Sequence, residues 1–366
     1  GTACSCQAWH PIRSRLARMS APMTIPATAD AEALQLAKAA DLVYVSDDTP
    51  GISRRRFGRG FAYYAPTGRK LTRTTEIERI KALVIPPAYE NVWICPLANG
   101  HLQVTGEDQR GRKQYRYHER WREVRDRAKF DALLDFAAAL PRIRRTTGRH
   151  LRLSGLPREK VLAAVVRVLD ATLMRIGNEE YTRTNGSFGL TTLRARHADV
   201  AGREITFRYT AKGGKPRELT MTHKRLAGLV RKCQDLPGQQ LFAYRNDRGD
   251  VIDVTSQSVN DYLRAVADGP FTAKDFRTWA GTVEAATTLR DLGPAETKTA
   301  LKKNTVTAID AAAKLLGNTR AVSRKSYIHP TVLEAYENGE VLGEPRKRTR
   351  LRQDESAVVR LLEANR

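Results

Sequence analysis

The alternation of apolar and polar residues predicts a sheet-rich segment in the first third of the chain. In residues 92–104, apolar side chains alternate on both sides of Asn99-Gly100, a pair that favours the tight turn of a β-hairpin. A similar pattern at 61–73 predicts a second hairpin, and the apolar run at 42–46 predicts a strand. With a short helix expected at 31–40, this part of the chain is predicted to be mostly antiparallel sheet.

Beyond Lys129 the apolar residues recur at the spacing of amphipathic helices. Phe130, Leu133 and Ala137 would share one helical face, and a longer helix is expected over 158–177. The remaining elements are helices expected around 222–235, 256–267, 279–291 and 306–316, and hairpins expected at 205–221 and 246–249.

This change of period predicts an α+β protein of two lobes. We expect a small, antiparallel-sheet-rich N-terminal domain over 31–128 and a larger, mostly helical catalytic domain over 129–343. Residues 1–30 are interpreted as a disordered or mis-annotated leader, and the segment "EPRKRTRLR" opens what is expected to be a solvated basic tail over 344–366.

The charge balance gives the strongest indication of a binding partner. Lys and Arg total 63 against 40 Asp and Glu, a net charge of +23. Such an excess attracts polyanions, and nucleic acid is the usual partner. An Arg-rich proteome would also produce this composition, so the charge alone does not establish DNA binding.

Cysteine usage and hydropathy narrow the cellular setting. The four cysteines show neither the spacing of a zinc site nor a disulfide framework, so no metal site is expected and a reducing cytoplasm fits best. No run of 18 apolar residues is present, so we expect no membrane partner.

The stretch "SRKSYIHP" contains the first candidate for chemistry. Tyr327 lies between Arg324 and Lys325 on one side and His329 on the other. It could be a half-buried helix residue, an ordinary surface tyrosine, or a nucleophile held against an anionic target. As a nucleophile it would need nearby cations, because a free phenol ionises only near pH 10.

Other basic residues could supply those cations. Arginine binds two phosphate oxygens at once and keeps its charge, and Arg175 and Arg277 occur at a helix end and before a further helix. Lys212 is expected at a hairpin tip, where it is either a solubilising turn residue or an ammonium group that enters a bound groove.

These segments, in this order, resemble the type IB DNA topoisomerases in their compact bacterial and poxvirus-like form. The resemblance covers about 300 residues, from "LVYVS" to "LEAYENGEV". The segments that carry it are "IPPAYENVWICPLANGHLQVTGEDQRGRKQYRYHERW", "RIGNEEY", "GSFGLTTLRARH", "TAKGGK", "KDFRTWAGT" and "SRKSYIHP".

The resemblance implies a role for each candidate. Tyr327 matches the tyrosine that becomes linked to a DNA 3′-phosphate and expels a 5′-hydroxyl. Arg175 and Arg277 match the arginines that stabilise the transition state, and Lys212 matches the general acid. Asn318 replaces the histidine of viral and eukaryotic members, so it could donate a hydrogen bond but could not carry a positive charge.

The segment "GRKQYRYH" is either an ordinary basic strand or, as the resemblance implies, the part of the small lobe that enters the DNA major groove. Gln114 could then bind a base edge while Arg112 and Lys113 hold phosphates. The remaining DNA contacts expected from the resemblance are Tyr115, Tyr117 and Tyr181.

The function expected is relaxation of positive and negative supercoils by a monomeric clamp on duplex DNA in a bacterial nucleoid. Single-strand cleavage, rotation and religation would need neither ATP nor a metal, with Mg²⁺ at most accelerating product release. A tyrosine recombinase is the nearest rival, although its usual H-x-x-R pattern is Lys274-Asp275-Phe276-Arg277 here. A non-catalytic architectural DNA-binding protein is the alternative of a different class.

Overall fold

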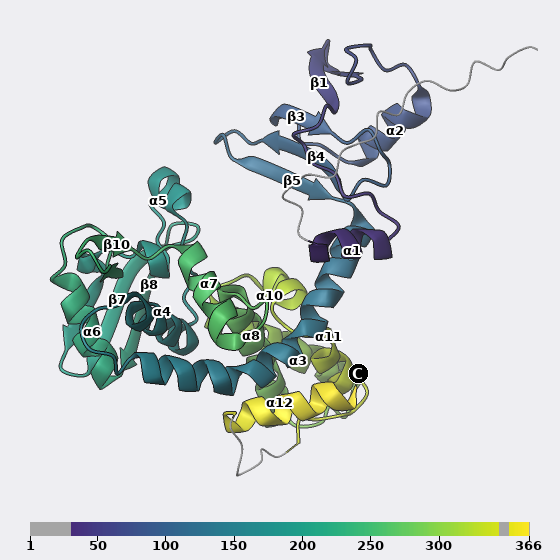
Figure 1. The fold of residues 1–366 in the computed structure, drawn as a ribbon. Coiled ribbons are helices and arrows are strands. Elements are labelled where there is room, and N and C mark those ends of the chain that lie inside the picture. The colour runs from purple at the N-terminus through teal and green to yellow at the C-terminus, as the bar shows by residue number, and fades with distance from the viewer. Residues whose placement is uncertain (1–30, 344–350, 366) are drawn as a thin grey trace, which may run out of the picture. The chain divides into compact units, whose positions relative to one another are not determined.

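The structure is a computed structural model that describes residues 31–343 and 351–365. The chain forms two compact units, Gly1–Ala128 and Lys129–Arg366, which are described separately (Figure 1). The predicted leader at 1–30 and the first part of the predicted tail, 344–350, lie outside the described residues.

The first unit is built on a five-stranded sheet in the order β2-β1-β3-β4-β5, and every pairing in it is antiparallel. The apolar residues Ile52, Val92, Ile94 and Val104 form a buried cluster with Ile80 of the second helix. The elements are α1 Ala31–Ala39, β1 Ile52–Phe57, β2 Gly60–Tyr64, α2 Thr74–Ala82, β3 Glu90–Ile94, β4 Leu102–Glu107 and β5 Lys113–Tyr117.

The hairpin predicted at 92–104 is confirmed, with Ile94 opposite Val104 in the β3–β4 register. The strand predicted at 42–46 is wrong, because Val43 forms only an isolated bridge to Gly100. The strand that pairs with β2 was not predicted, because it contains three consecutive arginines. The segment "ISRRRF" of β1 does not alternate in polarity, yet it pairs with β2 along its length.

The second unit is mostly helical and contains two small antiparallel sheets, in the orders β6-β7-β8 and β10-β9. Its helices are α3 Glu119–His150, which begins in the first unit, α4 Arg158–Thr172, α5 Glu179–Asn185, α6 Lys224–Gln234, α7 Ser256–Ala267, α8 Ala273–Leu292, α9 Lys298–Leu316, α10 Arg320–Ser326, α11 Pro330–Glu337 and α12 Gln353–Ala364. Its strands are β6 Ala198–Ala201, β7 Glu204–Ala211, β8 Lys215–Thr222, β9 Ala243–Arg245 and β10 Val251–Asp253.

The helix α4 is the centre of this unit (Figure 1). It is buried on almost every side, from Val161 to Asp170 except at Arg167, because α6, α7, α8, β8 and β9 all contact it. A helix that is apolar all round requires such surroundings. No helix in the described part of the chain is long and apolar enough to cross a membrane.

Two helices begin earlier than the apolar spacing predicted. α8 starts at Ala273 and α9 at Lys298, since their first turns are polar but capped. The Asp275 carboxylate accepts from the Thr272 backbone N–H at 2.7 Å, and Thr297 Oγ1 accepts from the Ala300 backbone N–H at 3.1 Å. Such caps satisfy otherwise unpaired backbone donors.

The prediction of a solvated tail is wrong for residues 351–365, most of which form the helix α12. The helix α12 lies beside α11 and α8 (Figure 1), and its Ala357, Val358 and Leu362 belong to the core of the second unit. The basic run that precedes this helix concealed its apolar face, so composition was misleading for this segment.

A buried ion network also holds α12. Arg144 of α3 donates to Asp170 of α4 at 3.0 Å and to Glu355 of α12 at 2.7 Å. Burial alone would lower the pKa of Arg144, but hydrogen bonds to Glu355 and Asp170 raise it above its ordinary value. Arg352 adds a contact to Asp170 at 3.2 Å.

Substituting Arg144→Ala should destabilise the second unit by about 3 kcal/mol, because it leaves two buried carboxylates without their main partner. Urea denaturation followed by circular dichroism measures this change. The control is Arg208→Ala, which removes an exposed pair with Glu218 and should have little effect. Equal effects of the two substitutions would contradict the structural role of the network.

Candidate active site

The five candidate residues come from separate elements of the second unit. Arg175 follows α4, Lys212 lies between β7 and β8, Arg277 is on α8, Asn318 follows α9, and Tyr327 follows α10. Arg175, Lys212 and Arg277 line one small pocket, together with Leu173, Met174, Phe188, Tyr209, Ala211, Arg217 and Leu316. Asn318 contacts Arg175, and the Tyr327 ring lies beside Arg277.

Arg175 is positioned by a tight pairing of two glycine-containing segments. The α4 helix ends at Leu173 in the left-handed conformation, and the backbone carbonyl of Arg175 then accepts from the Leu190 N–H at 2.8 Å. A Cβ atom on Gly189 would lie 2.6 Å from the Gly177 backbone. The motifs "RIGNEEY" and "GSFGLTT" therefore form one structural unit, with no space for a side chain between them.

Arg277 is a buried cation with only 5% of its surface exposed. Its Nη1 donates to the Leu173 carbonyl and its Nη2 to the Leu316 carbonyl at 2.8 Å. These carbonyls lie at the C-terminal ends of α4 and α9, where a positive charge is favoured. Burial, together with the charge of Arg175, lowers the pKa of Arg277 to about 10.

Two buried N–H donors at this site lack a hydrogen-bond partner within the described residues. They are Nε of Arg277 and Nδ2 of Asn318. The Oδ1 atom of Asn318 accepts from Arg175, which also donates to the Gly317 carbonyl at 3.3 Å. Because buried donors are normally paired, these two point to an absent acceptor.

Tyr327 ends α10 and is half-buried. The guanidinium carbon of Arg277 lies 5.4 Å from its ring centroid. A Cβ atom on Gly281 would lie 2.6 Å from the Tyr327 carbonyl oxygen, and the His329 N–H donates to Thr282 Oγ1 at 3.0 Å. The motif "KDFRTWAGT" is part of α8, and the segment that contains Tyr327 packs directly against it.

Sequence reasoning missed Lys129, at the point where α3 enters the second unit. Its ammonium group donates to the Ser326 carbonyl and lies 5.8 Å from the Tyr327 ring centroid. The adjacent Phe130 ring contacts His329 at a centroid distance of 5.2 Å. α3 therefore contacts the chain on both sides of Tyr327. The sequence indicated only that helical spacing begins after Lys129, and nothing in it linked this lysine to Tyr327.

His329 has a structural position. Its Nδ1 accepts from the Thr331 N–H at 3.2 Å and so caps α11. Burial lowers the pKa of this histidine to about 4, which leaves the ring neutral near pH 7. The neutral form is the one that can accept the capping hydrogen bond.

Lys212 is exposed at the tip of the β7–β8 hairpin, whose chain reverses through Gly213 and Gly214 at φ values of 82° and 74°. Arg217 on β8 was also missed. Its guanidinium group lies against Gly317, since a Cβ atom there would be 3.1 Å from its Cζ. The hairpin that carries Lys212 is thereby in contact with the turn that carries Asn318.

The predicted DNA-contacting segment lies in the first unit. Arg112 pairs with Asp108 at 2.6 Å, and Gln114 donates to the same carboxylate at 3.0 Å. The hydrogen bond from Arg112 holds the pKa of Asp108 well below its ordinary value. Lys113 pairs with Asp47 at 2.6 Å.

The aromatic residues of the same strand are exposed. The rings of Tyr115 and Tyr117 stack at 6.2 Å with an interplanar angle of 8°, and both side chains are open to solvent. Tyr181 belongs to α5, but its side chain lies outside the described part of the structure.

No group of three His, Cys, Asp or Glu side chains among the described residues could hold a metal ion. Cys95 and Cys233 are buried and free. Burial raises the pKa of Cys233 to about 12, so this thiol is a core residue and not a nucleophile at neutral pH.

A phenol beside a buried guanidinium group, with unpaired N–H donors at the same site, suits proteins that act on phosphodiesters. Comparison with known proteins identifies which ones. Residues 118–353 match the family of the eukaryotic DNA topoisomerase I catalytic core, and residues 60–108 match the bacterial DNA topoisomerase IB N-terminal domain.

Individual relatives agree with these matches. The DNA topoisomerase 1B of Acanthamoeba polyphaga mimivirus is 32% identical over 296 residues, which cover 79% of this chain and 88% of that protein. The DNA topoisomerase 1B of Vaccinia virus (strain Copenhagen) is 22% identical over 252 residues, 67% of this chain and 75% of that protein.

The chain therefore belongs to the type IB DNA topoisomerase family and is an isomerase that changes DNA topology. The predicted family, fold class and enzyme class are confirmed. The family match decides against both the tyrosine recombinase and the non-catalytic architectural protein.

The glycine contact behind Arg175 leads to a prediction. Gly189→Ala should destabilise the second unit by about 1–3 kcal/mol, because the new methyl group overlaps the Gly177 backbone. The same displacement should move Arg175 and slow DNA cleavage. Urea denaturation and the rate of covalent-complex formation measure the two effects.

The matched control is Gly228→Ala. A Cβ atom at Gly228 meets nothing within 4 Å, and alanine inside a helix is favoured over glycine by about 0.5–1 kcal/mol. This variant should be at least as stable as the wild type. If Gly189→Ala changed neither the stability nor the rate of covalent-complex formation, the close approach of Gly189 to Gly177 would not position Arg175.

Proposed function

We propose that Tyr327 is the nucleophile of this topoisomerase. Its phenol oxygen attacks a DNA phosphodiester and forms a 3′-phosphotyrosyl bond, while the bond to the 5′-oxygen breaks and leaves a 5′-hydroxyl. The free end rotates about the intact strand, and attack by the 5′-hydroxyl restores both the DNA and the tyrosine. Each step exchanges one phosphoester for another, so ATP is not consumed.

The observation that carries this proposal is that Arg277 and Asn318 each have a buried donor without a partner among the described residues, and that Arg277 lies beside the Tyr327 ring. Arg277 Nε and Asn318 Nδ2 are buried without an acceptor in the described structure, and a phosphate oxygen would satisfy them. Preorganised donors of this kind stabilise the charge that develops in the transition state. In the proposed mechanism Arg175 and Arg277 hold the nonbridging oxygens, and Asn318 contributes a neutral hydrogen bond.

Lys212 is proposed as the general acid for the leaving 5′-oxygen. An exposed hairpin tip can enter a DNA groove without moving the core of the unit. The hairpin that carries Lys212 contacts the turn that carries Asn318 through Arg217, which lies against Gly317. Arg217 is therefore proposed to keep the hairpin in register with Asn318.

Duplex DNA, preferably supercoiled, is the proposed substrate, and a monomer in the cytoplasm is the proposed form. In the first unit, the cations that would bind phosphate are paired with Asp108 and Asp47 in this structure. DNA phosphates would compete with these carboxylates, and Tyr115 and Tyr117 would supply exposed aromatic faces. Such binding weakens as salt increases.

We also propose that no metal ion is required. The arginines provide the positive charge that metal ions supply in other phosphoryl-transfer enzymes, and Lys212 provides the proton for the leaving oxygen. Mg²⁺ would act at most on product release.

The decisive test is relaxation of negatively and positively supercoiled plasmid in EDTA without ATP. The wild type should relax both, whereas Tyr327→Phe should bind plasmid but neither relax it nor form a covalent complex. Relaxation by the Tyr327→Phe variant would overturn the nucleophile assignment. Wild-type activity that appears only with Mg²⁺ would overturn the metal-independent mechanism.

Lys129 yields a separate prediction, since it holds the carbonyl next to Tyr327. Lys129→Ala should slow covalent-complex formation roughly tenfold, equivalent to about 1.4 kcal/mol, with plasmid binding unchanged. Lys129→Arg should restore most of the rate because it keeps a charged donor. The control is Lys302→Ala, which removes an exposed lysine of α9 and should leave the rate unaltered.

A further inference from the structure

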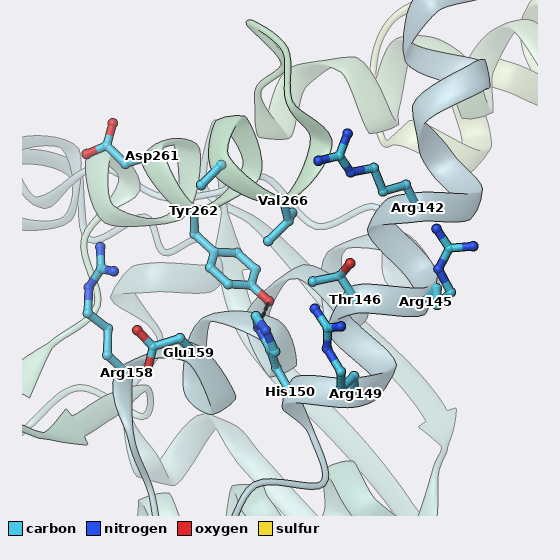
Figure 2. A pocket seen from close by; sticks show the side chains of 11 residues that line it. Arg142, Arg145, Thr146, Arg149, His150, Arg158, Glu159, Asp261, Tyr262 and Val266 are labelled. Carbon is cyan, nitrogen blue, oxygen red and sulfur yellow. Dashed lines mark hydrogen bonds between the residues drawn. The ribbon is translucent and has the colours of Figure 1, made fainter.

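A second cavity, of about 650 Å³, lies within the second unit and plays no part in the proposed reaction. It is open to solvent and is lined by the last turns of α3, the first turn of α4 and one side of α7 (Figure 2). Its volume falls within the range of small-molecule sites, about 300–1,000 Å³. The lining is polar and charged, which is unusual for a site that takes an apolar ligand.

Four arginines surround this cavity. Arg142, Arg145 and Arg149 recur at the spacing of one face of α3, and Arg158 reaches it from α4 (Figure 2). Arg142 pairs with Asp268 at 3.1 Å, at an exposed position. Arg145, Arg149 and Arg158 form no ion pair within the described part of the chain.

The neighbouring Arg144 differs from the unpaired arginines of the cavity. It lies on the same helix, one residue before Arg145, and two buried carboxylates neutralise it. An arginine that serves the fold is thus paired, whereas Arg145, Arg149 and Arg158 are exposed and form no ion pair within the described residues. Guanidinium groups that line one cavity favour a ligand with several negative charges.

One wall of the cavity is ordered by a buried hydrogen bond. Tyr262 is 4% exposed, and its hydroxyl lies 2.8 Å from His150 Nδ1 (Figure 2). Burial, together with the charge of Arg149, lowers the pKa of His150. The neutral ring can accept from Tyr262 through Nδ1, which leaves Nε2–H as a further donor.

The acidic members of the lining are Glu159 and Asp261, on the side of the cavity where Arg158 lies (Figure 2). Asp261 is already paired with Arg264 at 2.7 Å. Carboxylates at such a position suit the hydroxyl groups of a ribose, while the three arginines of α3 suit phosphate.

We propose that this cavity binds a polyphosphate chain, from a nucleoside triphosphate or from inorganic polyphosphate. The site is separate from the pocket that contains Arg175. The cavity lies at the first turn of α4 and Arg175 follows its last, and 15 residues at about 1.5 Å each separate the two ends by about 22 Å. Binding involves no hydrolysis, so it is compatible with relaxation that needs no ATP.

The test is isothermal titration of the full-length protein with sodium tripolyphosphate and, separately, with ATP, at constant ionic strength. The Arg145→Ala/Arg149→Ala double variant should bind either ligand at least tenfold more weakly. The control Arg152→Ala removes an exposed arginine outside the cavity lining and should bind like the wild type. Circular dichroism would verify that all variants are folded.

The two ligands distinguish the source of the phosphate. Tighter binding of ATP than of tripolyphosphate supports a nucleotide site, and equal binding supports inorganic polyphosphate. Absence of binding by the wild type, or unchanged binding by the double variant, would overturn the proposal.

Two further outcomes would also reject it. Loss of tripolyphosphate binding in Arg217→Ala, with retention in the double variant, would place the ligand in the pocket around Arg175. Weaker binding of a short DNA duplex by the double variant, with tripolyphosphate binding unchanged, would identify the arginines as a DNA contact.

Discussion

The structure of the second unit depends on one buried cation, Arg277. A guanidinium group with 5% exposure is costly to desolvate, and its neighbour Arg175 adds repulsion. The cost is offset by the carbonyl groups of Leu173 and Leu316, at the ends of α4 and α9. One side chain thereby joins the two helix ends from which Arg175 and Asn318 follow.

Close backbone contacts then complete the arrangement. Gly189 against Gly177, and Gly281 against Tyr327, are approaches that no other residue type would permit without displacement. These contacts leave little freedom for the segments that carry Arg175 and Tyr327. Donors held in place in this way can stabilise the charge that develops in a transition state without a further rearrangement of the protein.

The many arginines of this chain fall into different physical settings. Arg144 is neutralised by two carboxylates and stabilises the contact with α12. Arg277 is buried beside carbonyl groups and has an unpaired Nε. Arg145 and Arg149 line a cavity and form no ion pair within the described residues. A net charge of +23 therefore does not describe one uniform DNA-binding surface, and the local partners of each arginine indicate what it can do.

The sequence by itself determined the family, the two-lobed α+β architecture and most of the elements, because hydrophobic period and glycine turns are local properties. It was wrong at 42–46, where one bridge replaces a strand, and at α12, where a basic run obscured an amphipathic helix. It named Arg175 and Tyr327 by resemblance, yet 152 positions separate them, so only the tertiary structure could bring them together. Lys129, Arg217 and the cavity beside Tyr262 had no distinctive pattern, since an exposed basic residue acquires a role only from the groups that the fold places around it.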